Sequence, residues 1–316
     1  MIKIFEMFSG YGGASFALQK AKIPFECVGY SEIDKHAIKC YNQNFSNIKN
    51  YGDCTKIDPS ELPDFDLLTG GFPCQSFSIA GNRRGFNDTR GTLFREIIRI
   101  AEVKKPKYML LENVRGLTNH DEGRTFDVIK KELLRIGYSI CYKVLNTKNY
   151  GIPQNRERIF ILCKLGKLEF GEFQFPKEQR LNTQIKDILE KYVDKKYYLS
   201  ENKKSKLFKR IRYGDSIINI KNNIICVQKH RKEERVYKNY FPTLTCLDTC
   251  NIYIQQQNEI RNLTPKECFR LMGFLNDEIN LNNITDSHCY KLAGKGWEIN
   301  LVSKIFKELY KNDKNN

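Results

Sequence analysis

Short apolar runs alternate with segments of helical periodicity over the first half of the chain. The apolar runs predict buried strands at 2–8, 25–33, 65–71, 107–114, 138–145 and 157–165. Apolar residues that recur with the period of a helix predict helices at 12–21, 34–45, 91–105 and 125–137. Asp34 is a predicted N-cap, Pro106 stops the third of these helices, and Gly137 ends the fourth.

Strands that alternate with helices in this way favour an α/β fold, in which a mostly parallel sheet carries helices on both faces. In such a sheet, ligands bind at the carboxyl ends of the strands. Side chains that directly follow the predicted strands are therefore the first candidates for a functional site.

The chain changes character after residue 183. The segment 184–260 is polar and basic with weak periodicity, and it predicts a second, smaller domain of short strands. Helical periodicity returns at 262–274 and at 299–311. Positive residues crowd at 201–215 and 228–240, within a chain of net charge +16 and pI about 9.2. This local concentration of charge indicates a polyanionic partner.

Composition excludes several classes of protein. An apolar fraction of 41% and a charged fraction of 28% over 316 residues are typical of a globular protein with a sizeable core. No apolar run has the length of a membrane span, and the N-terminus lacks a signal peptide, so we expect a cytoplasmic protein with no membrane partner. The 11 cysteines are expected to be reduced. No metal site is expected, because Cys246 and Cys250 form the closest pair and the histidines are scattered.

A glycine-rich turn, residues 8–13, lies between the first predicted strand and the first predicted helix. Its glycines let the backbone approach a ligand closely, and the helix N-terminus offers free N–H donors. Glu32 ends the second strand, at the position where an acidic residue grips ribose hydroxyls. The spacing of Gly10, Gly12 and Gly13 is not GxGxxG, which argues for a nucleoside cofactor without pyrophosphate. Asp53 is a candidate acceptor for an adenine amino group.

Cys74 follows a third strand and is the candidate nucleophile. A thiol attacks as the thiolate, so it needs positive charge or a base nearby and an acid for the substrate. Glu112 ends a neighbouring predicted strand, and Arg156 and Arg158 precede another. A thiol, a carboxylate and guanidinium groups at the strand ends of one sheet indicate catalysis rather than core filling.

The stretches FSGYGG, SEID, GFPCQSFS, ENV, QNRER, RNLTPKECFRLMGF and YKLAGKGW follow one another along the chain. In this order they resemble the motifs of the DNA (cytosine-5) methyltransferase family, of the compact bacterial or phage restriction-modification type. The resemblance spans almost the whole chain, and the combination of PCQ, ENV and QxRxR is highly specific. It implies a Rossmann-like S-adenosylmethionine-dependent methyltransferase fold with a small target-recognition domain.

The resemblance implies a role for each catalytic candidate. Cys74 would attack carbon 6 of a cytosine flipped out of duplex DNA, and Glu112 would protonate ring nitrogen 3. Arg158 would bind the cytosine carbonyl oxygen, Arg156 would support the pocket, and Asn113 would help to set the loop. S-adenosyl-L-methionine would give its methyl group to carbon 5 and leave S-adenosyl-L-homocysteine. The target base must leave the stack to be reached.

The resemblance also implies two sets of binding residues. The cofactor set is Phe8, Gly10, Tyr11, Gly12, Gly13, Glu32, Ile33, Asp53, Cys54 and Pro73. The DNA set is Gln75, Ser78, Arg83, Arg84, Arg90, Lys232, Arg235, Thr243, Leu244 and Thr245. Phosphate contacts in the DNA set would give affinity, and only contacts to base edges would give sequence specificity.

The domains implied are a catalytic, cofactor-binding domain at 1–183 and 284–316 and a target-recognition domain at 184–283. We expect a monomer that methylates cytosine in a short sequence of double-stranded DNA, with a cognate restriction endonuclease encoded nearby.

The sequence bears on three other functions. The same chemistry serves tRNA in some relatives, so an RNA cytosine-5 methyltransferase is an alternative. Lys295 stands where the family has asparagine near the cofactor, which leaves open a catalytically weakened DNA-binding relative. A nicotinamide dehydrogenase fails on the missing GxGxxG spacing.

Overall fold

The computed structural model describes residues 1–73, 92–167, 169, 173–205, 225–229, 234–237, 239–245, 252–256 and 259–311. The chain divides into two compact units. The first unit comprises Met1–Leu145, Glu157–Lys177 and Leu301–Asn316, and the second comprises Asn146–Arg156 and Glu178–Asn300. Within the described ranges, no helix combines the length and the apolar character that crossing a membrane requires.

A six-stranded sheet forms the centre of the first unit, in the order β2-β1-β3-β4-β7-β5. Its strands are β1 (Ile2–Met7), β2 (Phe25–Ser31), β3 (Leu67–Gly71), β4 (Tyr108–Val114), β5 (Tyr138–Asn146) and β7 (Glu157–Leu165). The first four strands pair in parallel, and β7 pairs antiparallel to β4. The mostly parallel sheet predicted from the alternation of strands and helices is confirmed.

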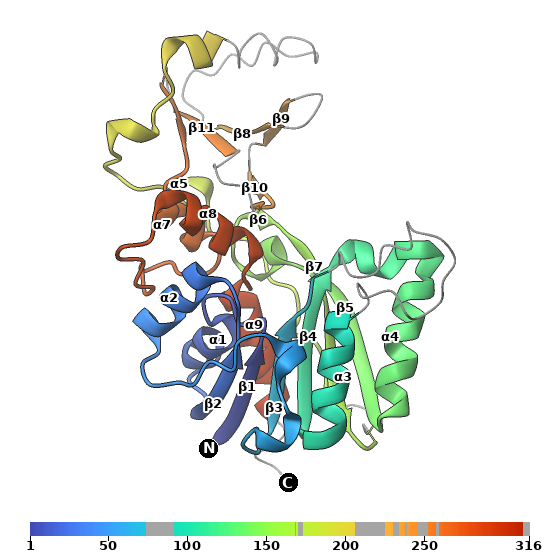
Figure 1. The fold of residues 1–316 in the computed structure, drawn as a ribbon. Helices are drawn as coiled ribbons and strands as arrows, with labels where there is room; N and C mark the ends of the chain where they lie inside the picture. The colour runs from blue at the N-terminus through green and yellow to red at the C-terminus, as the bar shows by residue number, and fades with distance from the viewer. Residues whose placement is uncertain are drawn as a thin grey trace, which may run out of the picture. The chain divides into compact units, whose positions relative to one another are not determined.

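Helices cover both faces of this sheet (Figure 1). They are α1 (Gly13–Ala21), α2 (Lys35–Asn44), α3 (Thr92–Lys104), α4 (Arg124–Arg135) and α9 (Ile299–Lys311). Because side chains alternate along a strand, β1 serves both faces. Phe5 and Met7 join the cluster formed with α3 and α4, whereas Glu6 contacts Ser15 of α1 and Tyr41 of α2.

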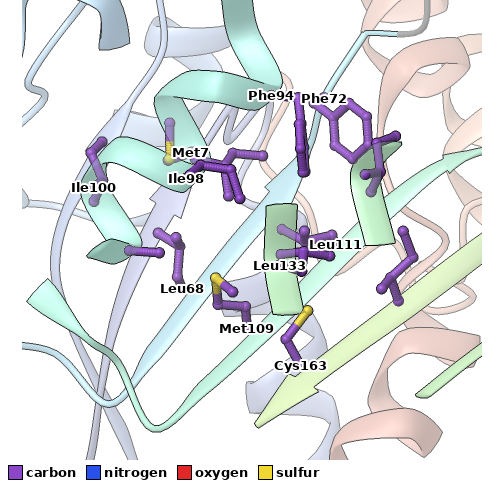
Figure 2. Packing of buried hydrophobic residues seen from close by; sticks show 14 of the residues in the cluster. Met7, Leu68, Phe72, Phe94, Ile98, Ile100, Met109, Leu111, Leu133 and Cys163 are labelled. Atoms are coloured by element: carbon purple, nitrogen blue, oxygen red, sulfur yellow. The ribbon is translucent and has the colours of Figure 1, made fainter. Parts of the chain in front are cut away.

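The α3–α4 face holds a continuous apolar cluster (Figure 2). Leu68, Met109 and Leu111 are fully buried on the central strands and pack against these two helices. At one end of the cluster the rings of Phe72 and Phe94 lie 5.4 Å apart. Phe72 directly follows β3, so the core extends to the point where the chain leaves the sheet.

Two of the predicted helix ends are formed by the expected residues. The carboxylate of Asp34 accepts hydrogen bonds from the N–H groups of His36 and Ala37 and so caps α2. Helix α4 ends at Arg135, with Ile136 as the C-cap, and Gly137 follows with a φ of 89°. A positive φ at this place is readily adopted by glycine, which explains why the helix stops there.

The second unit contains a four-stranded antiparallel sheet in the order β12-β11-β8-β9. Its strands are β8 (Ile225–Lys229), β9 (Glu234–Tyr237), β11 (Ile252–Gln256) and β12 (Glu259–Asn262), and β6 (Gln154–Asn155) pairs separately with β10 (Phe241–Pro242). Among its described α-helices are α5 (Ile185–Ile188), α7 (Pro265–Arg270), α8 (Asp286–Lys295) and the first residues of α9, and residues 201–205 are also helical. Short 3-10 helices are η1 (Cys54–Lys56), η2 (Pro59–Glu61) and η5 (Arg115–Gly123) in the first unit and η6 (Thr147–Tyr150) and η7 (Lys195–Tyr197) in the second.

The helix predicted at 262–274 is wrong in its extent. Thr264 caps α7 and Pro265 occupies its first position, so the helix begins only there, after β12 has ended at Asn262. The helix ends at Arg270, and Gly273 adopts a φ of 96°. Helical periodicity alone could not separate the capped helix from the strand and turn on either side of it.

The compact units have different bounds from the predicted domains. Residues 284–300 pack with the second unit, where the hydroxyl of Tyr290 donates to the Leu263 carbonyl. Ile299 donates its N–H to the carbonyl of Met272 in the same unit. The segment 146–156 belongs there too, because β6 pairs with β10.

Helix α1 is attached to the sheet by a buried carboxyl group. Its N-cap is Gly12, which has no side chain to accept from the first turn. Glu6, 1% exposed, supplies the acceptor instead: Oε2 accepts the Ala14 N–H, and Oε1 accepts from the hydroxyls of Ser15 and Tyr41. Burial raises the pKa of the Glu6 carboxyl, although these hydrogen bonds oppose the shift.

We expect the stability of the first unit to fall as the pH rises above the ordinary glutamate pKa of 4.5. A raised pKa means that the folded state holds the Glu6 proton more tightly than the unfolded chain, so the free energy of unfolding decreases until the folded pKa is passed. Glu6→Gln should flatten this profile. Urea unfolding across pH 4 to 8, followed by circular dichroism, checks this, with Glu26→Gln on the exposed side of β2 as control. Parallel profiles for Glu6→Gln and the unmodified protein would contradict it.

A buried ion pair holds the second unit together around α7. Arg261 forms two hydrogen bonds with Glu267, at 2.7 and 2.8 Å, and Glu267 is 0% exposed. The Glu267 carboxylate also accepts the N–H groups of Glu190 and Thr264, each at 2.8 Å. One carboxylate thus joins β12, α7 and the chain that follows α5.

We expect Glu267→Ala to lower the free energy of unfolding by about 3–5 kcal/mol, because it leaves the Arg261 charge buried without its carboxylate. Trp297 is the single tryptophan of the chain and is buried in the second unit, so its fluorescence during urea unfolding follows this unit. Lys196→Ala removes a solvent-exposed pair with Asp286 and should change the unfolding curve little. Equal curves for the two variants would refute a stabilising role for the buried pair.

Candidate active site

The turn after β1 has an unusual backbone. Phe8, Gly10 and Gly12 have φ values of 53°, 56° and 92°. For Phe8, a bulky residue, positive φ is a strained conformation of the kind found at ligand-binding sites. A Cβ atom on Gly12 would lie 2.7 Å from Cε2 of Phe45, so this position requires glycine.

Glu32 lies against this turn, as its position after β2 predicts. Its Oε2 accepts the Gly10 N–H at 3.0 Å, and its Oε1 accepts the N–H groups of Ile33 and Asp34 at 2.8 and 2.9 Å. The turn and the acidic residue therefore form one cluster at the carboxyl ends of β1 and β2. The Ile33 side chain is 73% exposed beside it.

Asp53 begins the 3-10 helix η1 on the next loop. Its Oδ1 accepts from both the N–H and the hydroxyl of Thr55, and these hydrogen bonds lower the pKa of the Asp53 carboxyl. Cys54 is buried behind it, with its carbonyl bound by Arg99 at 2.9 Å. The Asp53 carboxylate thus stays ionised and half-exposed on a fixed loop.

Two members of the predicted cofactor set have other surroundings than expected. Tyr11 is 1% exposed, and its ring packs at a tilt against that of Phe16. Gly13 is the buried first residue of α1. Neither offers a side chain to a ligand, because one is a core ring and the other has none.

Sequence reasoning missed Asn50. Its Oδ1 accepts the N–H groups of Glu32 and Gly52, and its Nδ2 donates to the Glu32 carbonyl. It joins the end of β2 to the loop that carries Asp53. No motif marks it in the sequence, because an asparagine in a polar loop is ordinary turn chemistry.

A carboxyl group on β4 and a guanidinium group on β7 lie together further along the same edge of the sheet. Glu112 Oε1 lies 2.9 Å from Nε of Arg158, with the two side chains 10% and 15% exposed. Val114 of β4 pairs with Arg158 of β7, so Arg158 is a diagonal neighbour of Glu112 on the same face. Glu112 also lies directly beside Gly71 of β3. Glu112, the predicted acid, and Arg158, the cation predicted to bind cytosine, therefore lie next to the end of the strand that leads to Cys74.

Asn113 fixes the exit of β3. Its Nδ2 donates to the carbonyl of Phe72 at 2.9 Å, and its Oδ1 accepts the N–H of Val114. Asn113 is 2% exposed and Phe72 3% exposed, whereas Pro73 is exposed. The residue before Pro73 is thus anchored to β4 and to the core.

Several predicted site residues lie outside the described residues. They are Cys74, Gln75, Ser78, Arg83, Arg84, Arg90 and Lys232. Arg235 is placed by its backbone in β9, where it pairs with Gln228.

The second unit encloses Arg156 in carbonyl groups. The guanidinium is 2% exposed, and it donates to the carbonyls of Leu244, Gly294 and Gly296. The last two carbonyls lie at the C-terminus of α8, where the helix dipole favours a cation. Arg156 therefore joins the predicted recognition segment to the end of α8.

The predicted recognition segment is held by the segment that carries Arg156. Leu244 donates its N–H to Oε1 of Gln154 at 3.0 Å, and the Thr243 hydroxyl donates to the Asn155 carbonyl at 2.6 Å. Phe241 donates its N–H to the Pro153 carbonyl. Thr245 follows with an exposed side chain.

Lys295 is the last residue of α8 and is exposed. A cation in the last turn of a helix is favourable. Gly294 and Gly296 on either side keep their carbonyl bonds to Arg156. Lysine at this position is therefore compatible with the packing around it.

Several of the described cysteines are buried thiols. Among them, burial raises the pKa of Cys54 and Cys289 to about 12, and that of the fully buried Cys163 further. A thiol with a raised pKa is a poor nucleophile. Within the described ranges, no cluster of histidine, cysteine or carboxylate side chains could hold a metal ion.

Comparison with known proteins identifies the family. The family model described as C-5 cytosine-specific DNA methylase matches residues 2–311. The chain is 42% identical over 240 residues to the orphan methyltransferase M.Rho11sI of Bacillus phage rho11s, covering 66% of this chain and 48% of that protein. It is 38% identical over 320 residues to the type II methyltransferase M.Bsp6I of Bacillus sp. (strain RFL6), covering 98% and 99%. The chain spans about half the length of the two phage relatives that it matches.

The fold is also similar to solved structures. The crystal structure of the S. pombe Dnmt2 methyltransferase matches with a TM-score of 0.76 over 98% of this chain and 99% of that one, at 24% identity. At this identity the likeness concerns the fold alone, and it agrees with the Rossmann-like methyltransferase fold that the resemblance implied. Because the family model covers the chain from the first strand to the last helix, the chain belongs to the C-5 cytosine-specific DNA methylase family.

Proposed function

We propose that this chain methylates carbon 5 of cytosine within a short sequence of double-stranded DNA, as the protective half of a restriction-modification system. One observation carries the proposal: Glu112 and Arg158 form a largely buried ion pair at the edge of the sheet, beside the end of β3. The next residue after Pro73 is Cys74. A base held by the pair would lie beside the strand that leads to the thiol.

The methyl donor is proposed to be S-adenosyl-L-methionine, with S-adenosyl-L-homocysteine as product. The residues fit such a nucleoside: Glu32 would bind the ribose hydroxyls, and Asp53 would accept from the adenine amino group. The positive φ values of Phe8 and Gly10 bring the backbone of the turn to the same edge. When bound, this cofactor supplies an electrophilic methyl group next to its ribose.

The chain's own residues would prepare the cytosine for that methyl group. The Cys74 thiolate adds to carbon 6, forming a carbon–sulfur bond, and the ring electrons move toward carbon 5. Glu112 in its acid form gives a proton to ring nitrogen 3, which balances the charge. After methylation, loss of the carbon 5 proton to solvent water restores the double bond and expels the thiolate, and ring nitrogen 3 returns its proton to Glu112.

Arg158 would hold the cytosine by its carbonyl oxygen. A guanidinium presents several N–H donors in a plane, so it binds a carboxylate and a carbonyl side by side. Asn113 would act through the backbone, because it anchors the Phe72 carbonyl before Pro73. The base must be flipped out of the duplex to reach this pair.

DNA binding is proposed to divide between the two units. The loop of Gln75, Ser78, Arg83, Arg84 and Arg90 would contact phosphates or the groove. In the target-recognition domain, Thr243, Leu244 and Thr245 would lie near the backbone of the flipped nucleotide, with Lys232 and Arg235 nearer the bases. Arg156 would support them, because it binds the Leu244 carbonyl. We propose a monomer in the cytoplasm that needs no metal, with a cognate restriction endonuclease encoded nearby.

The test is transfer of labelled methyl from S-adenosylmethionine to mixed-sequence duplex DNA, followed by sequencing for 5-methylcytosine. We expect methylated cytosines in one short context and no transfer to tRNA. Cys74→Ser should abolish turnover but leave DNA binding, because the nucleophile adds little to affinity. Transfer to tRNA alone would favour the RNA alternative. If the unmodified protein binds DNA but transfers no methyl group, and Lys295→Asn restores the transfer, the catalytically weakened relative would be favoured. Methylation by Cys74→Ser would remove the thiol from the mechanism.

Glu112→Gln should lower kcat by about 10²–10⁴-fold, the usual worth of a placed acid. The amide keeps the size of the side chain but cannot give up a proton to ring nitrogen 3. Single-turnover rates at saturating cofactor and DNA measure the effect. Glu102→Gln on α3 is a matched control, since Glu102 pairs with Arg135 at an exposed position. An unchanged rate in Glu112→Gln would exclude it as the acid.

A further inference from the structure

We infer that Asn50 is a positioning residue for the cofactor, which sets Glu32 and the Asp53 loop in one fixed arrangement. The inference rests on the proposed function, because it concerns the same nucleoside site. Asn50 matches no motif of the sequence, and its role follows from its three hydrogen bonds.

All three bonds join backbone groups on either side of the site. Two N–H groups converge on Oδ1, from Gly52 at 2.9 Å and from Glu32 at 3.2 Å. Nδ2 donates to the Glu32 carbonyl at 3.1 Å. Two donors on one atom identify that atom as the oxygen, so the network fixes the orientation of the amide.

The backbone around Asn50 strengthens the same junction. Tyr30 donates its N–H to the Lys49 carbonyl, and Tyr51 donates its N–H to the Tyr30 carbonyl at 2.7 Å. The Ser31 hydroxyl donates to the Gly52 carbonyl, also at 2.7 Å. Residues 49–52 therefore extend the sheet at the end of β2, where a further parallel strand would lie.

Asn50 connects Glu32 to the loop of Asp53, and the separation of these two carboxylates must stay fixed for both to bind the cofactor. It holds both backbone polar groups of Glu32 and the N–H one residue before Asp53. The Glu32 carboxylate in turn holds Gly10 of the glycine turn. Ribose and adenine are joined rigidly to each other, so carboxylates that receive them bind well only when their separation is fixed in advance.

The experiment is calorimetric titration of S-adenosylhomocysteine into the unmodified protein, Asn50→Ala, Asn50→Asp and Asn276→Ala. Asn276 donates to Glu278 on an exposed turn of the second unit and serves as the matched control. We expect Asn50→Ala to raise the Kd for S-adenosylhomocysteine about 10-fold or more, because it removes several orienting hydrogen bonds. Asn276→Ala should bind like the unmodified protein. Asn50→Asp keeps the oxygen that accepts both N–H groups, so its Kd should fall between the two.

Kinetics separate positioning from general damage. In methyl transfer, Asn50→Ala should raise KM for the cofactor and leave kcat at saturation nearly unchanged, whereas partial unfolding would lower kcat alone. Equal Kd values for Asn50→Ala and the unmodified protein would overturn the inference, as would Asn50→Asp binding no better than Asn50→Ala. Absence of binding by the unmodified protein would instead overturn the proposed function.

Discussion

The candidate catalytic edge depends on one strand pairing, that of β7 antiparallel to β4. In a wholly parallel sheet, the first residues of β7 would lie at the far edge from the last residues of β4. Reversal of β7 sets Arg158 across from Val114 and diagonal to Glu112, so a residue at the start of one strand meets a residue at the end of another. The register fixes this meeting, because a slip of one residue would turn Arg158 to the opposite face.

Buried and half-buried polar side chains in each unit bind backbone groups. Asn113 donates to the Phe72 carbonyl, and Asn50 binds backbone groups of Glu32. Arg156 donates to carbonyls of the recognition segment and α8. Each bond fixes a piece of irregular chain next to a regular element. Loops held in this way can present binding groups with little freedom left to lose when a ligand arrives. These polar side chains therefore mainly hold the backbone in place, and few of their groups remain to contact a substrate.

Sequence patterns identified the strands of the first unit and the cap at Asp34, because apolar periodicity and capping are local properties. They failed at the limits of one helix and at one residue whose partners are distant in the sequence. The helix predicted over 262–274 is a strand end, a short helix and a turn, since Thr264 and Gly273 decide its limits. The carbonyls that enclose Arg156 could not be read from the sequence, and its support of a pocket stays a prediction. Asn50 was missed, because its partners on β2 carry no mark in the sequence around it.

The sequence by itself determined the fold class, the family, and which acidic and thiol residues follow the strands. It could do so because strand ends in an α/β sheet fall at one edge, whatever the details of packing. The tertiary structure alone decided the partners: Glu112 with Arg158, Glu6 with α1, and Asn50 with Glu32 and Gly52. These depend on strand order, strand direction and register, which bring together residues far apart in the chain and are not written in any short stretch of it.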